Sequence, residues 1–303
     1  MPAPASVVTI GVFDGVHLGH RALIDLTVSL ARTEGLRSVA VTFDPHPMSV
    51  VRGLDIPLLT TAARRRDLLM EQGIEHVHVC HFDLERAQQE PRAFIEEILM
   101  QVCGARMVVV GEGFRFGHKA MGDANGLRDA GLIVHEVPAV IAGVDRVSST
   151  RIRGALIEGD VTEARALLGR PHRIEGLVLH GSQRGRTFGY PTANVGVTNG
   201  LLVPADGVYA GWLTRGEIAH GFEGETALPA AISIGTNPTF DDVIDRRVEA
   251  FVLDTSGLDL YGEYVALDFQ ARLRAMQKFD GIDSLMAAMA HDVEQTRIAL
   301  GQV

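Results

Sequence analysis

Cysteine and long apolar runs are scarce in this sequence, which argues against a cysteine-based metal site and against a membrane-spanning protein. The 303 residues contain two cysteines, Cys80 and Cys103, which lie in the apolar stretches HVHVC and ILMQVC and are not spaced as a metal-binding pair. We expect both to be small core residues. No apolar run approaches the roughly 20 residues that a membrane helix needs. The N-terminal MPAPASVVTIG lacks the basic region of a signal peptide, so we expect a cytoplasmic protein with no membrane partner.

Basic residues are outnumbered as well, with 28 Lys and Arg against 38 Asp and Glu and a formal net charge of -10. An acidic chain is a poor binder of a phosphate backbone, so this composition argues against a nucleic-acid partner. The same charge means that a small polyanion such as ATP must be bound by local basic groups, backbone groups or a metal ion. Hydrophobic residues make up 46% of the chain, as in ordinary globular proteins.

Strand-like and helix-like patterns alternate from Val7 to about Gly169. The apolar strand-like runs are SVVTIGVF, RSVAVTF, EHVHVC, ARMVVVG and LIVHEV, and helical patterns lie between them at 19–34, 60–73 and 91–103. Near-continuous apolar strands alternating with helices predict an α/β domain whose parallel sheet is covered on both faces.

The pattern changes near Gly169, which predicts a division into domains at 1–169 and 170–303. Beyond it come RIEGLVLHG, GVYAGWL, PAAISIG, RRVEAFVLD and EYVALDFQARL, separated by Gly, Pro, Asn and Asp turns. Closely spaced strands followed by one helix, 283–300, predict a small β-barrel with a terminal helix. The helix should pack through an apolar face made of Leu285, Met286, Met289, Val293 and Ile298.

The string GVFDGVHLGH (11–20) directly follows the first strand and opens a helix. Its glycines allow close approach of a ligand, and a helix N-terminus offers free N–H groups to an anion. His17 and His20 lie three residues apart on one face, where they could donate hydrogen bonds to a phosphate under attack. Two other interpretations stay open: a structural or surface pair, and one half of a zinc site.

Two further segments combine hydroxyl, amide or basic groups. In VSSTRIRGALIEG (147–159), Ser and Thr residues precede a helix with Arg151 and Arg153 in its first turns, which suits either simple capping or phosphate binding. In HGSQRGRTFGYPTANV (180–195), a glycine- and arginine-rich stretch leads into PTAN, which we expect to form a turn. Thr192 and Asn194 carry oxygens of the type that Mg²⁺ accepts.

Taken whole, GVFDGVHLGH resembles the signature of HxGH nucleotidyltransferases in the form found in bacterial FAD synthetases, as do VTFDPHP (41–47) and the SSTxxR pattern. The resemblance implies a Rossmann-like domain that adenylylates FMN with ATP, with His17 and His20 as catalytic residues. It also implies a set of nucleotide- and phosphate-binding residues: Gly11, Phe13, Asp14, Gly15, Gly19, His46, Arg146, Ser149, Thr150 and Arg153.

One position departs from that family. Its members usually carry Asn or Asp before the first Phe of a GxNFxFG string, whereas GEGFRFG has Gly113 there. An amide or carboxylate that would help to hold flavin or nucleotide is therefore missing.

The second half resembles the riboflavin kinase domain, a six-stranded barrel, through PTAN, PADGVYAGW, SIGTNPTF, RRVEAFVLD and DLYGEYVALDFQARLRAMQKF in the same order. The resemblance implies that Glu249 is the catalytic base, although a strand Glu in VEAFVLD would by itself suit a solvent-facing position. It further implies that Thr192 and Asn194 hold Mg²⁺ and that a loop closes over the phosphates through Gly181, Arg184, Gly185, Arg186 and Gly189.

Together the motifs predict a bifunctional enzyme that makes FMN from riboflavin and ATP, and then FAD from FMN and a second ATP. Two alternatives stay open: a riboflavin kinase whose adenylyl transfer is weakened by Gly113, and a flavin-binding regulator without turnover. The sequence says nothing of oligomeric state.

Overall fold

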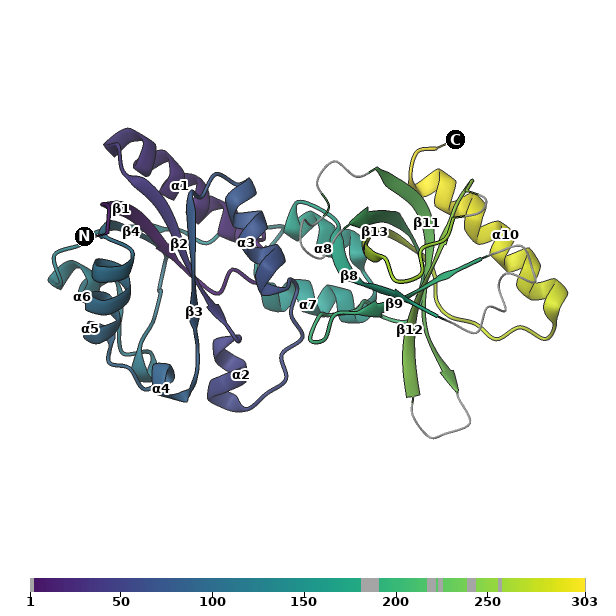
Figure 1. The fold of residues 1–303 in the computed structure, drawn as a ribbon, viewed down its shortest axis with the longest axis horizontal. Helices are drawn as coiled ribbons and strands as arrows, with labels where there is room; N and C mark the ends of the chain where they lie inside the picture. The colour runs from purple at the N-terminus through teal and green to yellow at the C-terminus, as the bar shows by residue number, and fades with distance from the viewer. Residues whose placement is uncertain are drawn as a thin grey trace. The chain divides into compact units, whose positions relative to one another are not determined.

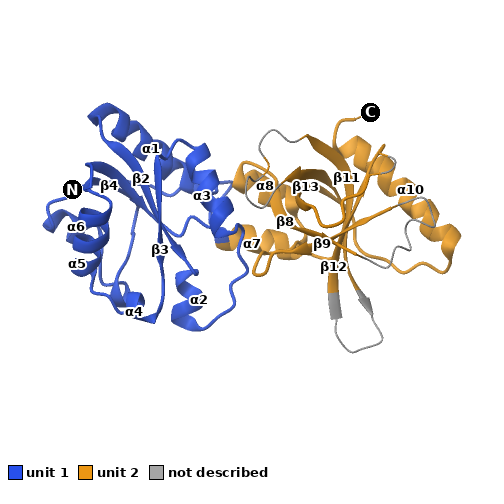
Figure 2. Ribbon diagram, viewed as in Figure 1, with its two compact units in different colours: residues 1–149 blue, residues 150–303 orange. Residues whose placement is uncertain are grey.

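The computed structural model describes residues 3–180, 191–216, 222, 226–238, 244–255 and 258–302. The chain forms two compact units, residues 1–149 and residues 150–303 (Figures 1 and 2). Each unit has its own sheet and core and is described by itself.

Unit 1 is built on a parallel sheet in the order β3-β2-β1-β4-β5. Strands β1 to β4 are labelled in Figure 1. Its strands are β1 (Ser6–Ile10), β2 (Arg37–Asp44), β3 (His76–His81), β4 (Ala105–Gly111) and β5 (Ile133–Val137). The predicted α/β class is confirmed. The strand order reverses direction at β1 and β4, and a ligand crevice in such sheets lies at the carboxyl ends of the strands at this point. The 11–20 string follows β1 and the GEGFRFG string follows β4.

Helices cover both faces of this sheet. Because successive strand residues point to opposite faces, Val8, Val39 and Val108 pack with Ile98 and Leu127 on one side. On the other side Ala40 packs with Ile24 and Leu69. The helices and short strands of the unit are α1 (Leu18–Glu34), α2 (Pro47–Arg52), α3 (Ala62–Glu71), α4 (Leu84–Ala87), α5 (Pro91–Phe94), η1 (Ile95–Val102), η2 (His118–Ala120), α6 (Ala124–Asp129), β6 (Ile141–Ala142) and β7 (Asp145–Arg146).

Unit 2 contains a closed antiparallel barrel, in the order β10-β11-β12-β9-β8-β13 among the described residues. This confirms the predicted six-stranded barrel. Its strands are β8 (His172–Leu179), β9 (Ala193–Val197), β10 (Gly207–Gly216), β11 (Ala227–Pro238), β12 (Ile244–Val252) and β13 (Tyr264–Arg274).

The prediction of a turn at PTAN is wrong in part, because β9 begins at Ala193. Asn194 lies opposite Glu249 of β12, and β9 also pairs with β8 on its other side. These two neighbours supply the backbone hydrogen bonds that hold a segment of low strand propensity in an extended form. Ala193 and Val195 are buried, while Thr192 and Asn194 alternate with them and are half-buried.

Among the described residues of this unit, the barrel is accompanied by the helices α7 (Ser149–Glu158), α8 (Val161–Leu168) and α10 (Ile282–Ala299). The last packs against β10, β11 and β13, as predicted for a terminal helix. Its buried contacts differ from the predicted apolar face, because Ile298 is 53% exposed whereas Asp292 and Thr296 are buried. The Asp292 carboxylate accepts two hydrogen bonds from Arg274, at 2.7 and 2.8 Å, which satisfies its charge.

Cys80 and Cys103 are both buried and free, as predicted. Burial raises the pKa of both thiols, that of Cys103 to about 11. Within the described ranges, none of the helices has the length and apolar character to cross a membrane.

Candidate functional site

The 11–20 loop leaves β1 through a strained backbone. Phe13 has φ 53° and Val16 has φ 40°, a left-handed conformation that is unusual for any residue with a side chain and rare for a β-branched one. Both side chains are fully buried, in a cluster with Ile24 and Leu69. Packing therefore fixes the loop in a single form ahead of the helix. Such strain is common where a backbone is held for function.

His17 and His20 lie side by side at the start of α1. Their rings stack with centroids 3.6 Å apart and planes inclined at 15°. His17 is the N-cap of the helix, and its Nδ1 accepts a hydrogen bond from the His20 N–H at 3.3 Å. A neutral ring in that arrangement carries its proton on Nε2. Among the described residues, no group of three or more His, Cys, Asp or Glu is placed to hold a metal ion, so the pair has no further ligand for a zinc site.

The neighbouring glycines fit closely against these rings. A Cβ atom at Gly19 would lie 3.1 Å from the His17 ring, and one at Gly11 would lie 3.1 Å from the Phe13 ring. Both distances are shorter than ordinary van der Waals contact, so a larger residue would displace the neighbouring ring.

Asp14 is buried within the loop and binds the segment that precedes α3. Its carboxylate accepts hydrogen bonds from Leu59 N at 2.9 Å and Thr60 N at 3.1 Å. Gly15 N donates to the Thr60 hydroxyl at 3.1 Å. The Ser149 hydroxyl donates to the Asp14 carbonyl at 2.9 Å. Ser149 is thus linked to the 11–20 loop, and it stands within α7 rather than ahead of it as predicted.

The remaining predicted nucleotide residues of unit 1 lie in loops or at the short strands. His46 is the N-cap of α2, where its Nδ1 accepts from Met48 N at 3.1 Å. Arg146 is exposed on β7. Gly113 has φ 71° in the turn after β4, and a Cβ atom there would meet no neighbour within 4 Å.

Thr150 and Arg153 belong to α7 and are therefore described with unit 2. Thr150 is exposed and Arg153 half-buried. The neighbouring Arg151 is ion-paired with Glu163 of α8.

The predicted kinase residues meet on the barrel. Glu249 and Asn194 are directly opposite each other on β12 and β9, so their side chains lie on the same face of the sheet. The Thr192 hydroxyl donates to Glu249 Oε2 at 3.3 Å. All three side chains alternate with buried residues and are half-buried.

This donor set fits Mg²⁺ in chemical type. A Thr hydroxyl, an Asn carbonyl and a carboxylate on one face are hard oxygen groups, and Mg²⁺ usually combines one or two such protein ligands with water and phosphate oxygens. The glycine- and arginine-rich residues predicted to cover the phosphates, which are Gly181, Arg184, Gly185, Arg186 and Gly189, lie outside the described residues.

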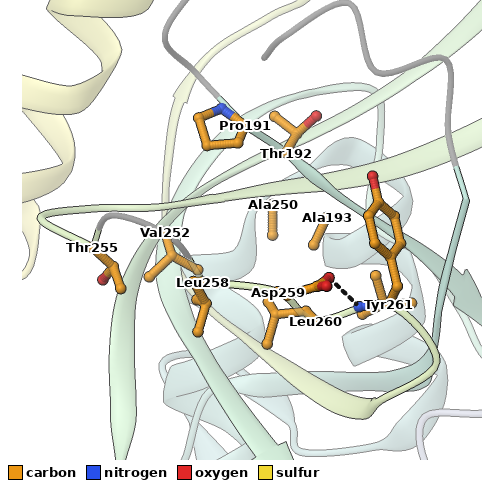
Figure 3. Close-up of a pocket in the computed structure, with 11 residues that line it drawn as sticks. Pro191, Thr192, Ala193, Ala250, Val252, Thr255, Leu258, Asp259, Leu260 and Tyr261 are labelled. Carbon is orange, nitrogen blue, oxygen red and sulfur yellow. Dashed lines mark hydrogen bonds between the residues drawn. The ribbon is translucent and has the colours of Figure 1, made fainter.

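A pocket of about 540 Å³ opens beside Thr192. Apolar side chains dominate its lining, among them Ala193, Ala250, Val252 and Leu260, and Figure 3 shows Thr192 on the side opposite Leu258, Asp259 and Leu260. The ring of Tyr261 completes the lining, and it stacks on His180 with centroids 4.3 Å apart.

A second pocket, also of about 540 Å³, lies beside Asn194 of β9. Asn194 lines it together with His180, Arg246 and Arg247, so its polar groups include two guanidinium groups in an acidic chain. The Arg246 Nε also donates to Asp206 at 2.8 Å. Thr192 thus lines an apolar pocket, and Asn194, two residues further along the chain, lines a basic one.

Sequence reasoning missed two groups of site residues. The pocket residues Asp259 and Tyr261 lie in the string DLYGEYVALDFQARLRAMQKF, which resembles the riboflavin kinase domain but does not mark these two residues as pocket residues. Thr60 lies in none of the motifs. It is the first residue of the helical pattern predicted at 60–73, and its hydrogen bond to the 11–20 loop depends on the tertiary fold.

Known proteins match the two units separately and together. Residues 2–151 match the FAD synthetase family and residues 168–300 match the riboflavin kinase family. The fold and the matches thus define a two-domain transferase.

The chain belongs to the family of bifunctional riboflavin kinase/FMN adenylyltransferases. It is 35% identical to the member from Listeria monocytogenes and 34% identical to that from Escherichia coli, each over 296 residues that cover 96% of this chain and 91% of the relative. A solved structure from Streptococcus pneumoniae, which is called a macrolide-efflux protein, is 33% identical and superposes with a TM-score of 0.88 over 98% of this chain and 95% of its own.

Proposed function

We propose that unit 2 transfers the γ-phosphate of ATP to riboflavin and that unit 1 then transfers the adenylyl group of a second ATP to the resulting FMN. The observation that carries the kinase assignment is the meeting of Glu249, Thr192 and Asn194 on one face of the barrel sheet, where Thr192 also lines the apolar pocket and Asn194 the basic one.

In the kinase step, the ribityl 5′-hydroxyl attacks the γ-phosphorus and the bond to ADP breaks. Glu249 accepts the hydroxyl proton, which keeps the attacking oxygen nucleophilic. Thr192 and Asn194 would hold Mg²⁺, which when bound neutralises charge on the phosphate oxygens. The apolar pocket suits a flat aromatic ring of one substrate, and the basic pocket suits phosphate groups.

In the adenylyl step, a phosphate oxygen of FMN attacks the α-phosphorus of ATP and pyrophosphate leaves. No covalent intermediate on the protein is needed, because positioning and hydrogen-bond donors aimed at the developing charge lower the barrier. His17 and His20 supply such donors at the start of α1, and the N–H groups of the helix add to them. His46 and Arg146 are further candidates for nucleotide contact.

Product chromatography separates the two steps in the intact chain. We expect Glu249→Gln to lower riboflavin phosphorylation by about 100-fold or more, since a general base contributes factors of that size, and to leave FAD formation from added FMN unchanged. His20→Asn should lower FAD formation from FMN and leave riboflavin phosphorylation unchanged. Glu263→Gln, which alters a half-buried Glu paired with Arg215, is the control. Absence of FAD and pyrophosphate from the parent chain with FMN, ATP and Mg²⁺ would refute the second activity.

A further inference from the structure

The segment that leads into α3, residues 59–65, contacts the loops that follow two different strands of unit 1. At its first end, Leu59 N and Thr60 N donate to the buried Asp14 carboxylate, and the Thr60 hydroxyl accepts from Gly15 N. Three hydrogen bonds therefore hold this segment against the loop that carries His17 and His20.

At its other end, the same segment contacts the end of β2. The Arg65 Nη2 donates to the Phe43 carbonyl at 2.8 Å. Phe43 stands three residues before His46, so this bond fixes the backbone from which the 44–47 loop departs. The segment is thus bonded to both ligand loops within a few residues of their histidines.

Arg65 is unusual because its charge is buried. Its side chain is 1% exposed, and its Nε has no hydrogen-bond acceptor among the described residues. Burial lowers the pKa of Arg65, and the charges of Asp14 and Asp44 oppose that shift. One of these carboxylates belongs to each ligand loop, so both loops contribute to stabilising the buried cation.

We propose that Thr60 and Arg65 are positioning residues for adenylyl transfer: they set the 11–20 loop and the 44–47 loop at a fixed separation. The three histidines then face one bound nucleotide in a single geometry. The inference rests on the proposed function of unit 1, because neither residue is placed to touch a substrate. A displacement of about 1 Å at a reacting group can cost a factor of about 100 in rate.

The test compares substitutions that remove one link each. Thr60→Val keeps the shape of the side chain and removes its hydroxyl, while Arg65→Met keeps the length and removes the cation. Arg64→Met is the matched control, since the adjacent Arg64 forms a surface ion pair with Glu71 on the same helix. Each variant is assayed as the full chain for FAD formation from FMN and for riboflavin phosphorylation, with thermal unfolding recorded in parallel.

We expect Thr60→Val and Arg65→Met to lower kcat for FAD formation by about 10- to 100-fold, with KM for ATP changing less than threefold. Riboflavin phosphorylation should stay within twofold of the parent, as should both activities of Arg64→Met. Arg65→Lys should recover part of the kcat lost in Arg65→Met, because it restores a cation between the two carboxylates.

Folded Thr60→Val and Arg65→Met chains with parental kcat would overturn the proposal. If Arg65→Met fails to fold, Thr60→Val decides alone, and parental kcat in that variant has the same meaning. A loss of stability with unchanged kcat at a temperature where the chain is folded would also overturn it, because it indicates a purely structural role. Failure of the parent to form FAD would refute the proposed adenylyl transfer itself, and this control is run first.

Discussion

Val16 and Phe13 illustrate what single residues contribute to the site. Left-handed backbone at such residues costs about 1–3 kcal/mol each, and complete burial of a large apolar side chain returns roughly 1.5–3 kcal/mol. Because these terms are similar in size, the loop keeps its strained form through packing and needs no ligand to impose it. The histidines that follow are therefore held in position before nucleotide binds.

Gly113 is the residue at which the adenylyl site differs from the family pattern, and its backbone permits a direct test. With φ 71° and open space around the Cβ position, this position accepts Asn, which tolerates left-handed backbone better than other residues with side chains. We predict that Gly113→Asn raises kcat/KM for FAD formation about 2- to 10-fold, the worth of one hydrogen bond. Gly113→Ala, which adds a Cβ without an amide, should give no gain. An Asn variant no faster than the parent would show that the missing amide does not limit the reaction.

Cys103 predicts how stability depends on alkaline pH. Its thiol has a pKa of about 11 in the folded chain against an ordinary value of 9.0, because burial disfavours the thiolate. The neutral thiol thus favours the folded state fully below pH 9, and this contribution is lost as pH rises from 9 towards 11. We expect the free energy of unfolding of unit 1 to fall by about 1–3 kcal/mol over this range from the thiol.

Urea unfolding at pH 7 to 10.5 measures this effect, and Cys103→Ala is the control. The variant should be less stable at pH 7 because it loses core packing, yet its stability should fall less steeply above pH 9. If the free energy of unfolding fell equally steeply with pH in the parent and in Cys103→Ala, the attribution of the alkaline loss of stability to Cys103 would be contradicted.

At the scale of elements, sequence patterns predicted most strands and helices of both units, because near-continuous apolar runs reflect burial directly. The main error was at β9. The strand begins with Ala193 and Asn194, two residue types of low strand propensity, and the pairing with β8 and β12 holds them extended. The exposure of Ile298 has a similar origin, since Asp292 and Thr296 take the buried side of α10 through the Arg274 ion pair.

Some residues of the candidate site could be predicted from the sequence, and others could not. His17, His20, Thr192, Asn194 and Glu249 could be found because they stand in long motifs. The pairing of Asn194 with Glu249 could not, since it depends on strand register. Thr60 and Arg65 act through backbone atoms distant in sequence, and no local pattern marks them.

The barrel strands β10 and β13 approach so closely that a single methyl group is predicted to be harmful. A Cβ atom at Gly211 would overlap the Asp268 carbonyl oxygen and lie 2.7 Å from Ile232 Cδ1. We expect Gly211→Ala to destabilise unit 2 by about 1–3 kcal/mol or more. In Gly154→Ala, within α7, the new Cβ meets nothing within 4 Å, so that helix should gain about 0.5–1 kcal/mol. Denaturant unfolding of the Gly211→Ala and Gly154→Ala chains, with residual riboflavin phosphorylation as the measure of folded unit 2, compares their stabilities. Equal stabilities would refute the packing argument.

On the scale of the whole molecule, helices α7 and α8 belong structurally with the barrel. Ala205 N donates to the Leu156 carbonyl, and Arg272 donates to that of Glu158. Helix α8 also contacts β8 and β13. The compact units divide at residue 149, whereas the division into domains at 1–169 and 170–303 stays a prediction from the sequence.

Fragments of the second half distinguish the two boundaries. We predict that a fragment of residues 150–303 unfolds at a temperature at least about 5 °C above that of residues 170–303, a difference of roughly 1.5 kcal/mol for a domain of this size. The shorter fragment loses the bonds to Leu156 and Glu158 and exposes apolar residues that α8 covers. Scanning calorimetry and kinase assays provide the measurement. Equal unfolding temperatures would show that the two helices do not support the barrel.

The pairing of β8 with β13 has a consequence for synthesis on the ribosome. All strands of unit 1 have been made by residue 149, so that unit can fold while the rest is translated, whereas β8 ends at Leu179 and must wait for β13, which begins at Tyr264. At about 5–20 residues per second this delay is on the order of ten seconds. A nascent chain thus carries a completed nucleotide-binding half next to an open strand edge, and premature termination before Tyr264 would abolish barrel closure while sparing the first half.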